Sequence, residues 1–396
     1  MQDDKPSGRV RLSRKRTQQL TSGHLWVYDT EVESVAGDPA PGDLVDLFTD
    51  TSRFCGRGFY NPSSKIRCRI LTFKDEPIDA DFWAARLRSA GSLRARVVSD
   101  TSAYRLVHGE SDLLPGLIVD RYGDVLVMQT LSLGMDRRKA ALADLLMTQT
   151  GARSVYQRND SHSRAQEGLP TETGFVRGEG PTLVEVTEGR ARFLVDIAQG
   201  QKTGWFCDQR ENRLAAASLA SGADVLEVFC HTGAFGIQAA LHGARSVVGL
   251  DVSAAGVVRS REHAALNKVD HLCRYEETDA FKALRRLERQ GDRYDGIILD
   301  PPAFARHRQA VPQALAGYKD INLRALALLR PEGWLVTCSC SHHVSEDAFW
   351  QAIREAARDA KRPLRLLEAR SQARDHPVLA GMPETRYLKC FILQTL

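Results

Sequence analysis

The stretch VLEVFCHTGAFG, residues 225–236, indicates the fold of the second half of this 396-residue chain. Its first residues form an apolar run that is typical of a buried strand, and a tight turn with Gly233 and Gly236 follows directly. A helix that begins after such a turn has free backbone N–H groups that can face a ligand. The stretch therefore predicts a strand, a ligand-binding turn and a helix.

Strand-like and helix-like segments alternate after this stretch. Apolar runs end near Asp251, Asp300 and Cys340, and helical segments such as residues 254–268 and 318–331 separate them. That alternation predicts a doubly wound, largely parallel sheet with helices on both faces, a Rossmann-like arrangement. In such a sheet, ligands bind beyond the carboxyl ends of the strands.

The first half of the chain predicts two further domains. Short alternating segments separated by turns, from residue 9 to about 75, are typical of strands and predict a small β-barrel. Beyond Pro77 the spacing becomes helical, and DRYGD at residues 120–124 joins two apolar runs as a hairpin. We therefore expect an α/β multidomain chain, with a β-barrel at 1–75, a central α+β domain at 76–189 and the doubly wound domain at 190–396.

Composition excludes several classes of protein. The hydrophobic fraction is 43%, yet no stretch approaches the roughly 20 uninterrupted apolar residues that a membrane span requires. The N-terminus has no apolar signal region, so we expect a cytoplasmic protein. The eight cysteines are scattered without a repeated C-x-x-C pair, which disfavours both a disulfide scaffold and a zinc ribbon.

Net charge is only +4, so basicity alone does not establish a polyanionic partner. The distribution of charge is more informative, because two basic clusters lie in the predicted barrel. Each cluster can contact phosphates, but each can equally be a solvated surface. The first cluster comprises Arg9, Arg11, Arg14, Lys15 and Arg16, and the second comprises Lys65, Arg67 and Arg69.

Three features predict a nucleotide-like cofactor at the edge of the sheet. The first is the turn at Gly233. The second is Asp251, which ends the following strand, where an acid can accept both hydroxyls of a ribose. Asp279 and Phe281 follow the next strand and suit the amino group and the ring of an adenine. Taken alone, Asp251 can instead cap a helix.

The order of these features, completed by DPP at residues 300–302, resembles the S-adenosylmethionine-dependent methyltransferases. The G-x-G-x-x-G pattern of nicotinamide enzymes is absent. Pro301 and Pro302 lack N–H groups and stiffen the turn, which directs Asp300 and nearby carbonyls toward a flat base. One use of such an edge is to methylate an exocyclic amine. The other is to methylate carbon 5 of a pyrimidine, which needs a thiolate on carbon 6.

Cys338 and Cys340 lie in WLVTCSCSHH, residues 334–343. In a strand they share one face, and Cys340 is nearest the carboxyl end, beside Asp300. A metal site needs three or four convergent ligands, and C-x-C-x-H-H is not an established zinc spacing. A disulfide between residues two apart in a strand is strained. We therefore expect no metal and expect Cys338 to be a core residue, whereas a core role suits Cys340 less well.

A more specific resemblance rests on five motifs in order: GQKTGWFCDQRENR, FCHTGAFG, DPPAF, GYKDINLRAL and SCS. With GHLWVYDTEV near the start, they resemble the bacterial large-subunit ribosomal RNA (cytosine-5)-methyltransferases, in which a PUA domain precedes a central domain and a catalytic domain. The resemblance implies that Cys340 attacks cytosine carbon 6, that Asp300 contacts the base, and that RNA is the partner. It also implies a set of residues around S-adenosylmethionine: Gln201, Lys202, Thr203, Phe229, Thr232, Gly233, Asp251 and Asp279.

The chain departs from that family at two places. Cys230-His231 stands where Ser-Tyr is expected, and DPP lacks the second cysteine that some RNA cytosine-5 methyltransferases carry before proline. The base that removes the carbon-5 proton is therefore open, with Lys319 and Asp320 as candidates, although a place near a helix N-terminus explains both equally well. We expect Pro301, Pro302 and Lys319 to contact the substrate.

Three functional hypotheses follow. The first is cytosine-5 methylation of a flipped-out or single-stranded base, with the basic clusters on phosphates. The second is methylation of an exocyclic purine amine by the DPP motif, with Cys340 only structural. The third is a non-catalytic RNA-binding factor that keeps the fold. PUA surfaces can also form dimer contacts, so a homodimer is possible.

Overall fold

The computed structural model describes residues 5–14, 16 and 22–396. The chain divides into two compact units, each built from separate segments. Unit 1 contains Met1–Val186, Leu194–Asp208 and Arg374–Thr385, and unit 2 contains Thr187–Phe193, Gln209–Ala373 and Arg386–Leu396. Within the described ranges, no helix has both the length and the apolar composition needed to cross a membrane.

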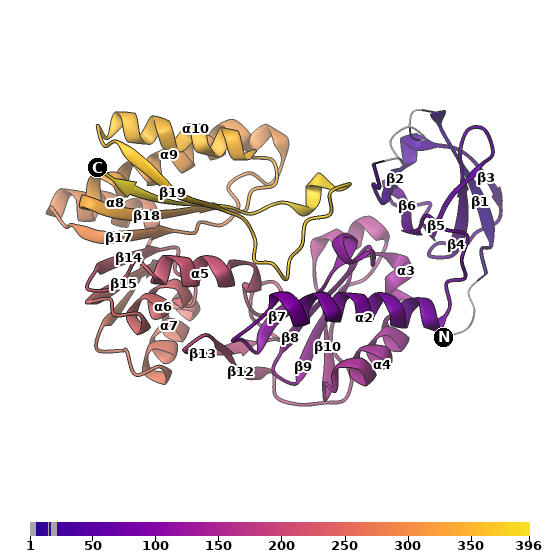
Figure 1. Ribbon diagram of the computed structural model, residues 1–396, viewed down its shortest axis with the longest axis horizontal. Coiled ribbons are helices and arrows are strands. Elements are labelled where there is room, and N and C mark those ends of the chain that lie inside the picture. Colours follow the sequence, from indigo (N-terminus) through magenta and orange to yellow (C-terminus); the bar gives the residue numbers. More distant parts are fainter. Residues whose placement is uncertain (1–4, 15, 17–21) are drawn as a thin grey trace. The chain divides into compact units, whose positions relative to one another are not determined.

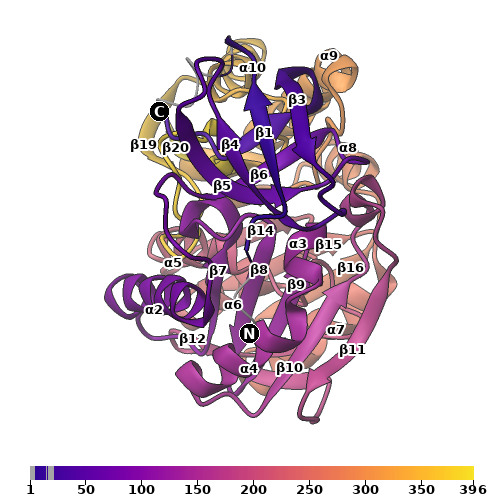
Figure 2. The ribbon, with the colours of Figure 1, turned by 90° about the vertical axis from the view of Figure 1, so that its right-hand side faces the viewer.

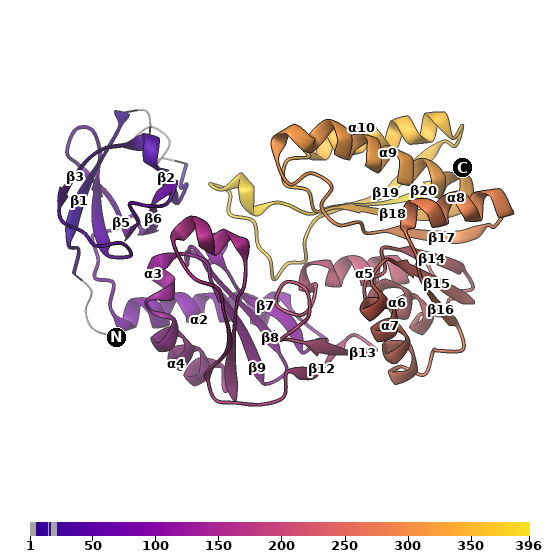
Figure 3. The same ribbon diagram turned by 180° about the vertical axis from the view of Figure 1, so that it is seen from behind.

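The first part of unit 1 is a six-stranded sheet with the order β2-β6-β5-β4-β1-β3, which curves around its own core (Figure 3). Side chains of β1 alternate between buried and exposed, so Val10 and Leu12 enter that core. Met382, from the last segment of unit 1, belongs to the same core. The strands are β1 (Gly8–Leu12), β2 (Trp26–Tyr28), β3 (Val32–Gly37), β4 (Leu44–Phe48), β5 (Phe54–Tyr60) and β6 (Ile66–Thr72).

The second part of unit 1 is the predicted α+β arrangement. Strands β7 to β11 lie side by side in chain order (Figure 2). The predicted hairpin is confirmed, because β8 ends at Tyr122 and β9 begins at Val125, with Gly123 at a left-handed φ of 60°. The elements are α2 (Ala80–Val97), β7 (Ala103–His108), β8 (Leu117–Tyr122), β9 (Val125–Thr130), α3 (Leu133–Asp136), α4 (Lys139–Thr150), β10 (Ser154–Asn159) and β11 (Glu172–Arg177).

Residues 194–208 lie in unit 1, although the sequence placed the start of the third domain at residue 190. Polar contacts inside unit 1 explain the difference. The Thr203 hydroxyl donates to Asp120 Oδ2 at 2.5 Å and lies 2.8 Å from the Tyr122 hydroxyl. Arg158 donates to the carbonyl of Ile197 at 2.9 Å. These side chains are distant in sequence, so no local pattern reveals the pairing.

Unit 2 is built on a seven-stranded sheet with the order β16-β15-β14-β17-β18-β20-β19. The first five strands of this order are parallel, as predicted, but β20 runs antiparallel to both of its neighbours. The strands are β14 (Asp224–Val228), β15 (Ser246–Asp251), β16 (Cys273–Glu277), β17 (Tyr294–Leu299), β18 (Leu329–Ser339), β19 (Leu364–Arg370) and β20 (Lys389–Thr395). A further two-stranded sheet consists of β12 (Leu183–Glu188) and β13 (Ala191–Asp196).

Helices cover both faces of the large sheet. Three of them, α8, α9 and α10, lie on one face, and α5, α6 and α7 lie on the other (Figures 1 and 3). The doubly wound, Rossmann-like fold predicted for this half is therefore confirmed. The helices are α5 (Arg210–Ala217), α6 (Ala234–Leu241), α7 (Ala254–Leu266), α8 (Ala280–Gln290), α9 (Val311–Leu328) and α10 (Glu346–Asp359).

Candidate active site

Four predicted site residues meet at the carboxyl edge of the sheet in unit 2. Phe229 follows β14, Asp251 ends β15, Asp300 follows β17 and Cys340 follows β18. These strands are parallel neighbours in the order β15-β14-β17-β18. Parallel strands place their carboxyl ends at the same edge, so residues far apart in sequence converge there.

The turn after β14 has an unusual backbone. Phe229, His231 and Gly233 have φ values of 63°, 50° and 75°. Residues with side chains rarely adopt this left-handed region, and such strain is concentrated at functional sites. Below the turn, the carboxylate of Glu227 accepts hydrogen bonds from the N–H groups of Phe235 and Gly236 at 3.2 and 2.9 Å. Burial raises the pKa of Glu227 to about 8.

Packing below the turn explains its glycines. A Cβ at Gly233 would lie 2.8 Å from the Tyr275 hydroxyl, and a Cβ at Gly236 would lie 2.6 Å from Glu227 Oε2. Gly233 also needs its positive φ. The sequence pattern predicts a close approach of a ligand at these glycines. The structure shows that the interior of unit 2 requires them as well.

Asp251 holds the same turn. Its Oδ2 accepts the N–H of His231 at 2.7 Å, and its Oδ1 accepts the N–H of Ser253 at 2.8 Å. The cap of α7 is Ser253, whose hydroxyl oxygen accepts from Gly256, so Asp251 is not itself the helix cap. An ionised carboxylate has about four acceptor positions. The two remaining positions suit the two hydroxyls of a ribose.

Aromatic rings line the next part of the edge. Phe304 lies 6.3 Å from Phe229, 6.1 Å from Phe281 and 4.7 Å from Tyr318, between ring centroids. Asp279 is exposed and caps α8, because its Oδ1 accepts the N–H of Lys282 at 2.9 Å. Phe304 lies within the DPPAF motif, which by itself predicts no role for this ring. Only the folded chain places Phe304 between both predicted cofactor aromatics.

Asp300 is oriented by a side chain that the sequence analysis missed. Gln209 donates from Nε2 to Asp300 Oδ1 at 2.9 Å, and its own Oε1 accepts from Asn212 Nδ2 at 2.7 Å. Gln209 is 3% exposed. The signal was present, because Gln209 lies within GQKTGWFCDQRENR, but that motif alone does not indicate which partner the amide holds.

Cys340 and the DPP turn lie together. The Cys340 sulfur is 4.0 Å from the carbonyl oxygen of Pro301, and the Cys340 residue is partly exposed. Cys338 is fully buried, as expected of a core residue. A hydrogen bond with Cys390, together with burial, raises the pKa of Cys338 well above its ordinary value. Of these two neighbouring cysteines, the environment of Cys340 is the more suitable for a nucleophile.

Three predicted cofactor residues, Gln201, Lys202 and Thr203, lie in unit 1 rather than unit 2. Thr203 is fully buried, and its hydroxyl is hydrogen-bonded to Asp120 and Tyr122, which anchors the segment inside unit 1. Gln201 and Lys202 are exposed.

The side chain of Lys319 forms ion pairs within unit 2. Its Nζ lies 2.7 Å from Asp359 and 3.6 Å from Glu355, both on α10, and the hydrogen bond with Asp359 raises the pKa of Lys319. A lysine held protonated is a poor base. The carboxylate of Asp320 also forms an ion pair, with Arg285 at 3.1 Å. Neither candidate is therefore suited to remove the carbon-5 proton.

The first basic cluster is only partly available to a polyanion. Arg9, Arg11 and Arg14 are exposed. Arg16, in contrast, is 2% exposed and donates to the carbonyls of His24 and Trp26 at 2.9 and 2.5 Å. The prediction that Arg16 contacts phosphate is therefore wrong, because its guanidinium is used inside unit 1. Lys15 lies outside the described residues.

The second cluster is divided in the same way. Lys65 is exposed and Arg67 is half-buried, with a hydrogen bond of 3.4 Å to the carbonyl of Asn61. Arg69 donates to Glu167 at 2.9 Å, which joins the two parts of unit 1. The partners of these side chains decide which of them can meet a ligand.

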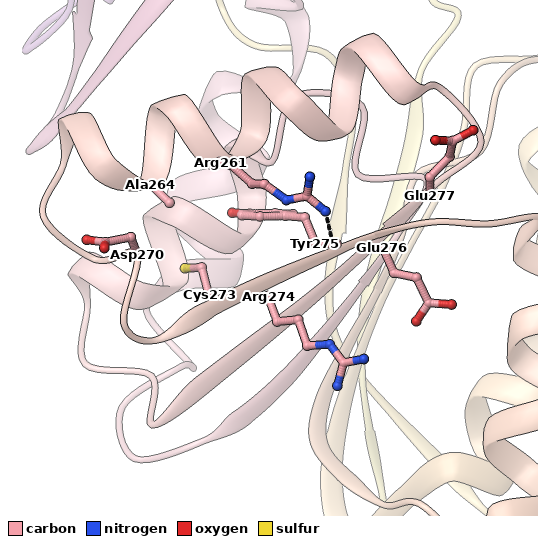
Figure 4. Close-up of a pocket in the computed structure, with 8 residues that line it drawn as sticks. All are labelled: Arg261, Ala264, Asp270, Cys273, Arg274, Tyr275, Glu276 and Glu277. Carbon is pink, nitrogen blue, oxygen red and sulfur yellow. Dashed lines mark hydrogen bonds between the residues drawn. The ribbon is translucent and has the colours of Figure 1, made fainter.

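A pocket of about 650 Å³ lies along β16 and α7 (Figure 4). None of its lining residues is among the predicted site residues, and they carry charges of both signs, which selects no class of ligand. Within the described part of the chain, no group of three or more His, Cys, Asp or Glu side chains could hold a metal ion. The pocket is lined by Arg261, Ala264, Asp270, Cys273, Arg274, Tyr275, Glu276 and Glu277.

Comparison with known families agrees with this geometry. A model described as a PUA-like domain matches residues 10–73, and a model described as an S-adenosylmethionine-dependent methyltransferase matches residues 106–384. The fold, the edge of the sheet and this second match define an S-adenosylmethionine-dependent methyltransferase with an N-terminal PUA-like domain.

Curated relatives narrow the class. The ribosomal RNA large subunit methyltransferase I of Shewanella denitrificans is 41% identical over 388 residues, which cover 96% of this chain and 98% of that protein. The protein of the same name from Tolumonas auensis is 40% identical over 394 residues, covering 98% and 99%. The chain therefore belongs to the family of ribosomal RNA large subunit methyltransferase I.

Solved structures share the fold over nearly the whole chain. A methyltransferase complexed with SAH superposes with a TM-score of 0.84 at 21% identity, covering 98% of this chain and 99% of that chain. An S-adenosylmethionine-dependent methyltransferase from Streptococcus mutans gives a TM-score of 0.82 at 20% identity, with the same coverage. At such identities the likeness establishes the fold alone.

Proposed function

We propose that this protein methylates carbon 5 of a cytidine in large-subunit ribosomal RNA, with Cys340 as nucleophile. The observation that carries the proposal is the meeting of Cys340 and the DPP turn at the ends of β18 and β17, with 4.0 Å between the sulfur and the Pro301 carbonyl oxygen. The names of the relatives support the substrate class. A ribosomal substrate also favours the bacterial cytoplasm as the place of action.

The residues at the edge of unit 2 fit S-adenosylmethionine. Asp251 keeps acceptor positions for ribose hydroxyls beside a turn of left-handed residues, and exposed Asp279 with Phe281 suits an adenine. Phe229, Thr232 and Gly233 supply the wall and backbone of that turn. When bound, the cofactor supplies an electrophilic methyl group.

Cys340 makes the pyrimidine reactive. Its thiolate donates an electron pair to carbon 6 and forms a sulfur–carbon bond. The electron pair of the carbon 5–carbon 6 double bond moves toward carbon 5. Carbon 5 then becomes nucleophilic and would accept the methyl group, with the electrons of the broken sulfur–methyl bond left on the cofactor's sulfur. Loss of the carbon-5 proton to a base restores the double bond, and the thiolate leaves. Asp300, oriented by Gln209, accepts hydrogen bonds from the edge of the base.

The first domain supplies contacts to the RNA backbone. Arg9, Arg11, Arg14 and Lys65 are exposed and suit phosphates, whereas Arg16 does not. The target base must leave its stack before a sulfur can reach carbon 6, so the substrate is a single-stranded region or a flipped-out nucleotide.

The test is transfer of a radiolabelled methyl group from S-adenosylmethionine to undermodified ribosomal RNA, with the product nucleoside identified by mass. We expect 5-methylcytidine from the wild type and a loss of at least about 1000-fold in Cys340→Ala, since removal of a nucleophile eliminates the covalent route. Cys338→Ala is the matched control. Cys338 lies two residues before Cys340, inside β18, and we expect this variant to retain activity if folded.

Two other outcomes would replace the proposal. A methylated purine, or activity that survives Cys340→Ala, would assign the chemistry to Asp300 and the prolines. Failure to bind S-adenosylmethionine in calorimetry, with intact RNA binding, would indicate an RNA-binding factor without catalytic activity.

A further inference from the structure

Lys389 is a buried lysine next to the proposed nucleophile. It is the first residue of β20, and its Cα pairs with that of Ser339, the residue before Cys340. Its side chain donates from Nζ to the carbonyls of Ser341 and Val344 at 2.7 and 2.9 Å. The residue is only 7% exposed. Burying an ammonium is unfavourable unless its charge and hydrogen bonds are used, so this position needs an explanation.

The two carbonyls belong to the turn that begins immediately after Cys340. Tyr318 holds the same stretch of chain, since its hydroxyl lies 2.9 Å from both Ser339 Oγ and Ser341 Oγ. The chain around Cys340 is therefore held by two anchors, one neutral and one cationic. A neutral donor would suffice to fix a turn, so the cation has a second use.

The charges around this turn favour an interaction between Lys389 and Cys340. Burial lowers the pKa of Lys389 to about 8, while the thiolate of Cys340 and then Glu346 oppose that effect, and Arg386 adds to it. Lys389 therefore remains mostly protonated at pH 7. Glu346 forms an ion pair with Arg386 at 2.5 Å, which weakens the electrostatic attraction between Glu346 and Lys389.

Other titratable groups near the turn do not supply the same charge. Desolvation, then Lys389 and His343, lowers the pKa of His342, so His342 is mostly neutral at pH 7. Burial raises the pKa of Tyr318, which keeps its hydroxyl protonated. Asp300, at the end of the neighbouring strand, carries the opposite charge and disfavours a thiolate.

We propose that Lys389 is a positioning residue for Cys340, which fixes the turn after the sulfur and favours the thiolate through its positive charge. This role rests on the proposed function only in taking Cys340 as the nucleophile. In the free enzyme the cation stabilises the sulfur anion before attack. It also stabilises the same anion as the leaving group when the methylated base is released.

The test measures the reactivity of Cys340 without RNA. Iodoacetamide alkylates a thiolate, forming a sulfur–carbon bond with loss of iodide, so the rate follows the thiolate fraction. We would measure the rate at Cys340 between pH 5.5 and 10, locating the product by peptide fragmentation. In Lys389→Met we expect the midpoint of the pH profile to rise by about one unit and the rate at pH 7 to fall about tenfold. Lys389→Arg should retain most of the wild-type profile.

Controls separate charge from folding. Lys361→Met removes an exposed lysine from unit 2 and should leave the profile unchanged. S-adenosylmethionine binding and thermal unfolding report whether Lys389→Met is folded. If it is not, the wild-type profile alone is decisive, because a midpoint at or above the ordinary thiol value of about 8.5 would overturn the proposal.

Two results distinguish this inference from the proposed function. A folded Lys389→Met that loses methyl transfer but keeps the wild-type alkylation profile would show a purely structural lysine and overturn the inference. A shifted profile in a protein that makes no 5-methylcytidine would support the coupling of Lys389 to Cys340 while rejecting the cytosine-5 chemistry.

Discussion

The carboxyl edge of the sheet in unit 2 and the basic clusters of the N-terminal sheet were both predicted as functional surfaces. At the sheet edge, Asp251 ends β15, Asp300 follows β17 and Cys340 follows β18, and these strands run parallel in one sheet. In the N-terminal sheet, exposed Arg11 and buried Arg16 lie five residues apart in one basic cluster. Strand order therefore predicts which residues lie at the sheet edge, whereas a run of like charges does not predict which side chains face water.

The largest expected effect tests the sheet edge. Asp300→Asn keeps the shape of the side chain and the hydrogen bond from Gln209 but removes the charge that we propose faces the base. We expect kcat for methyl transfer to fall between about 100- and 1000-fold with little change in KM for S-adenosylmethionine. Asp347→Asn, an exposed substitution in α10, is the control. If kcat of Asp300→Asn fell by less than about fivefold, Asp300 would have only a structural role.

The next effect tests the buried member of the basic cluster. Arg16→Met removes donors from the carbonyls of His24 and Trp26, so we expect the free energy of unfolding to fall by about 2–3 kcal/mol. Arg9→Met should change it by less than about 0.5 kcal/mol. Urea denaturation measures both. Equal effects of the two substitutions would remove the distinction between the exposed and buried arginines.

A pH effect tests the interior of the sheet edge. The pKa of Glu227 is about 8 in the folded protein, above the ordinary value of 4.5. Between these values the folded state holds a proton that the unfolded state lacks, so stability is highest below the lower value and falls as pH rises toward 8. From pH 6 to 8 we expect the wild type to lose about 2 kcal/mol more than Glu227→Gln, measured by urea denaturation. Parallel pH profiles would contradict this prediction.

The smallest expected effect concerns the exposed arginines. Arg9→Gln and Arg11→Gln each remove one proposed phosphate contact, so we expect RNA affinity to fall about threefold per substitution. Each should also reduce the slope of log affinity against log salt by about one. Fluorescence anisotropy at salt concentrations between about 50 and 200 mM measures both the affinity and the slope. An unchanged slope would exclude these residues as phosphate contacts.

The sequence alone indicated the doubly wound fold and the edge at which its site lies. Strand periodicity and chain order are local properties, and parallel pairing then brings their ends together. The same reasoning separated Cys338, which is buried in the core, from Cys340, which follows the strand. It did not predict that β20 is antiparallel, because an apolar strand has no direction until it pairs.

Tertiary structure decided which side chains are available and which neighbours they meet. Arg16 donates hydrogen bonds to internal carbonyls, and Thr203 donates one to Asp120. Lys319 forms an ion pair with a residue of α10. Gln209 reaches Asp300 across 91 residues of sequence, and Lys389 reaches the turn after Cys340 across 48. The sequence determined the chemical groups and the strands that carry them. Their burial and partners depend on long-range packing, which no local pattern encodes.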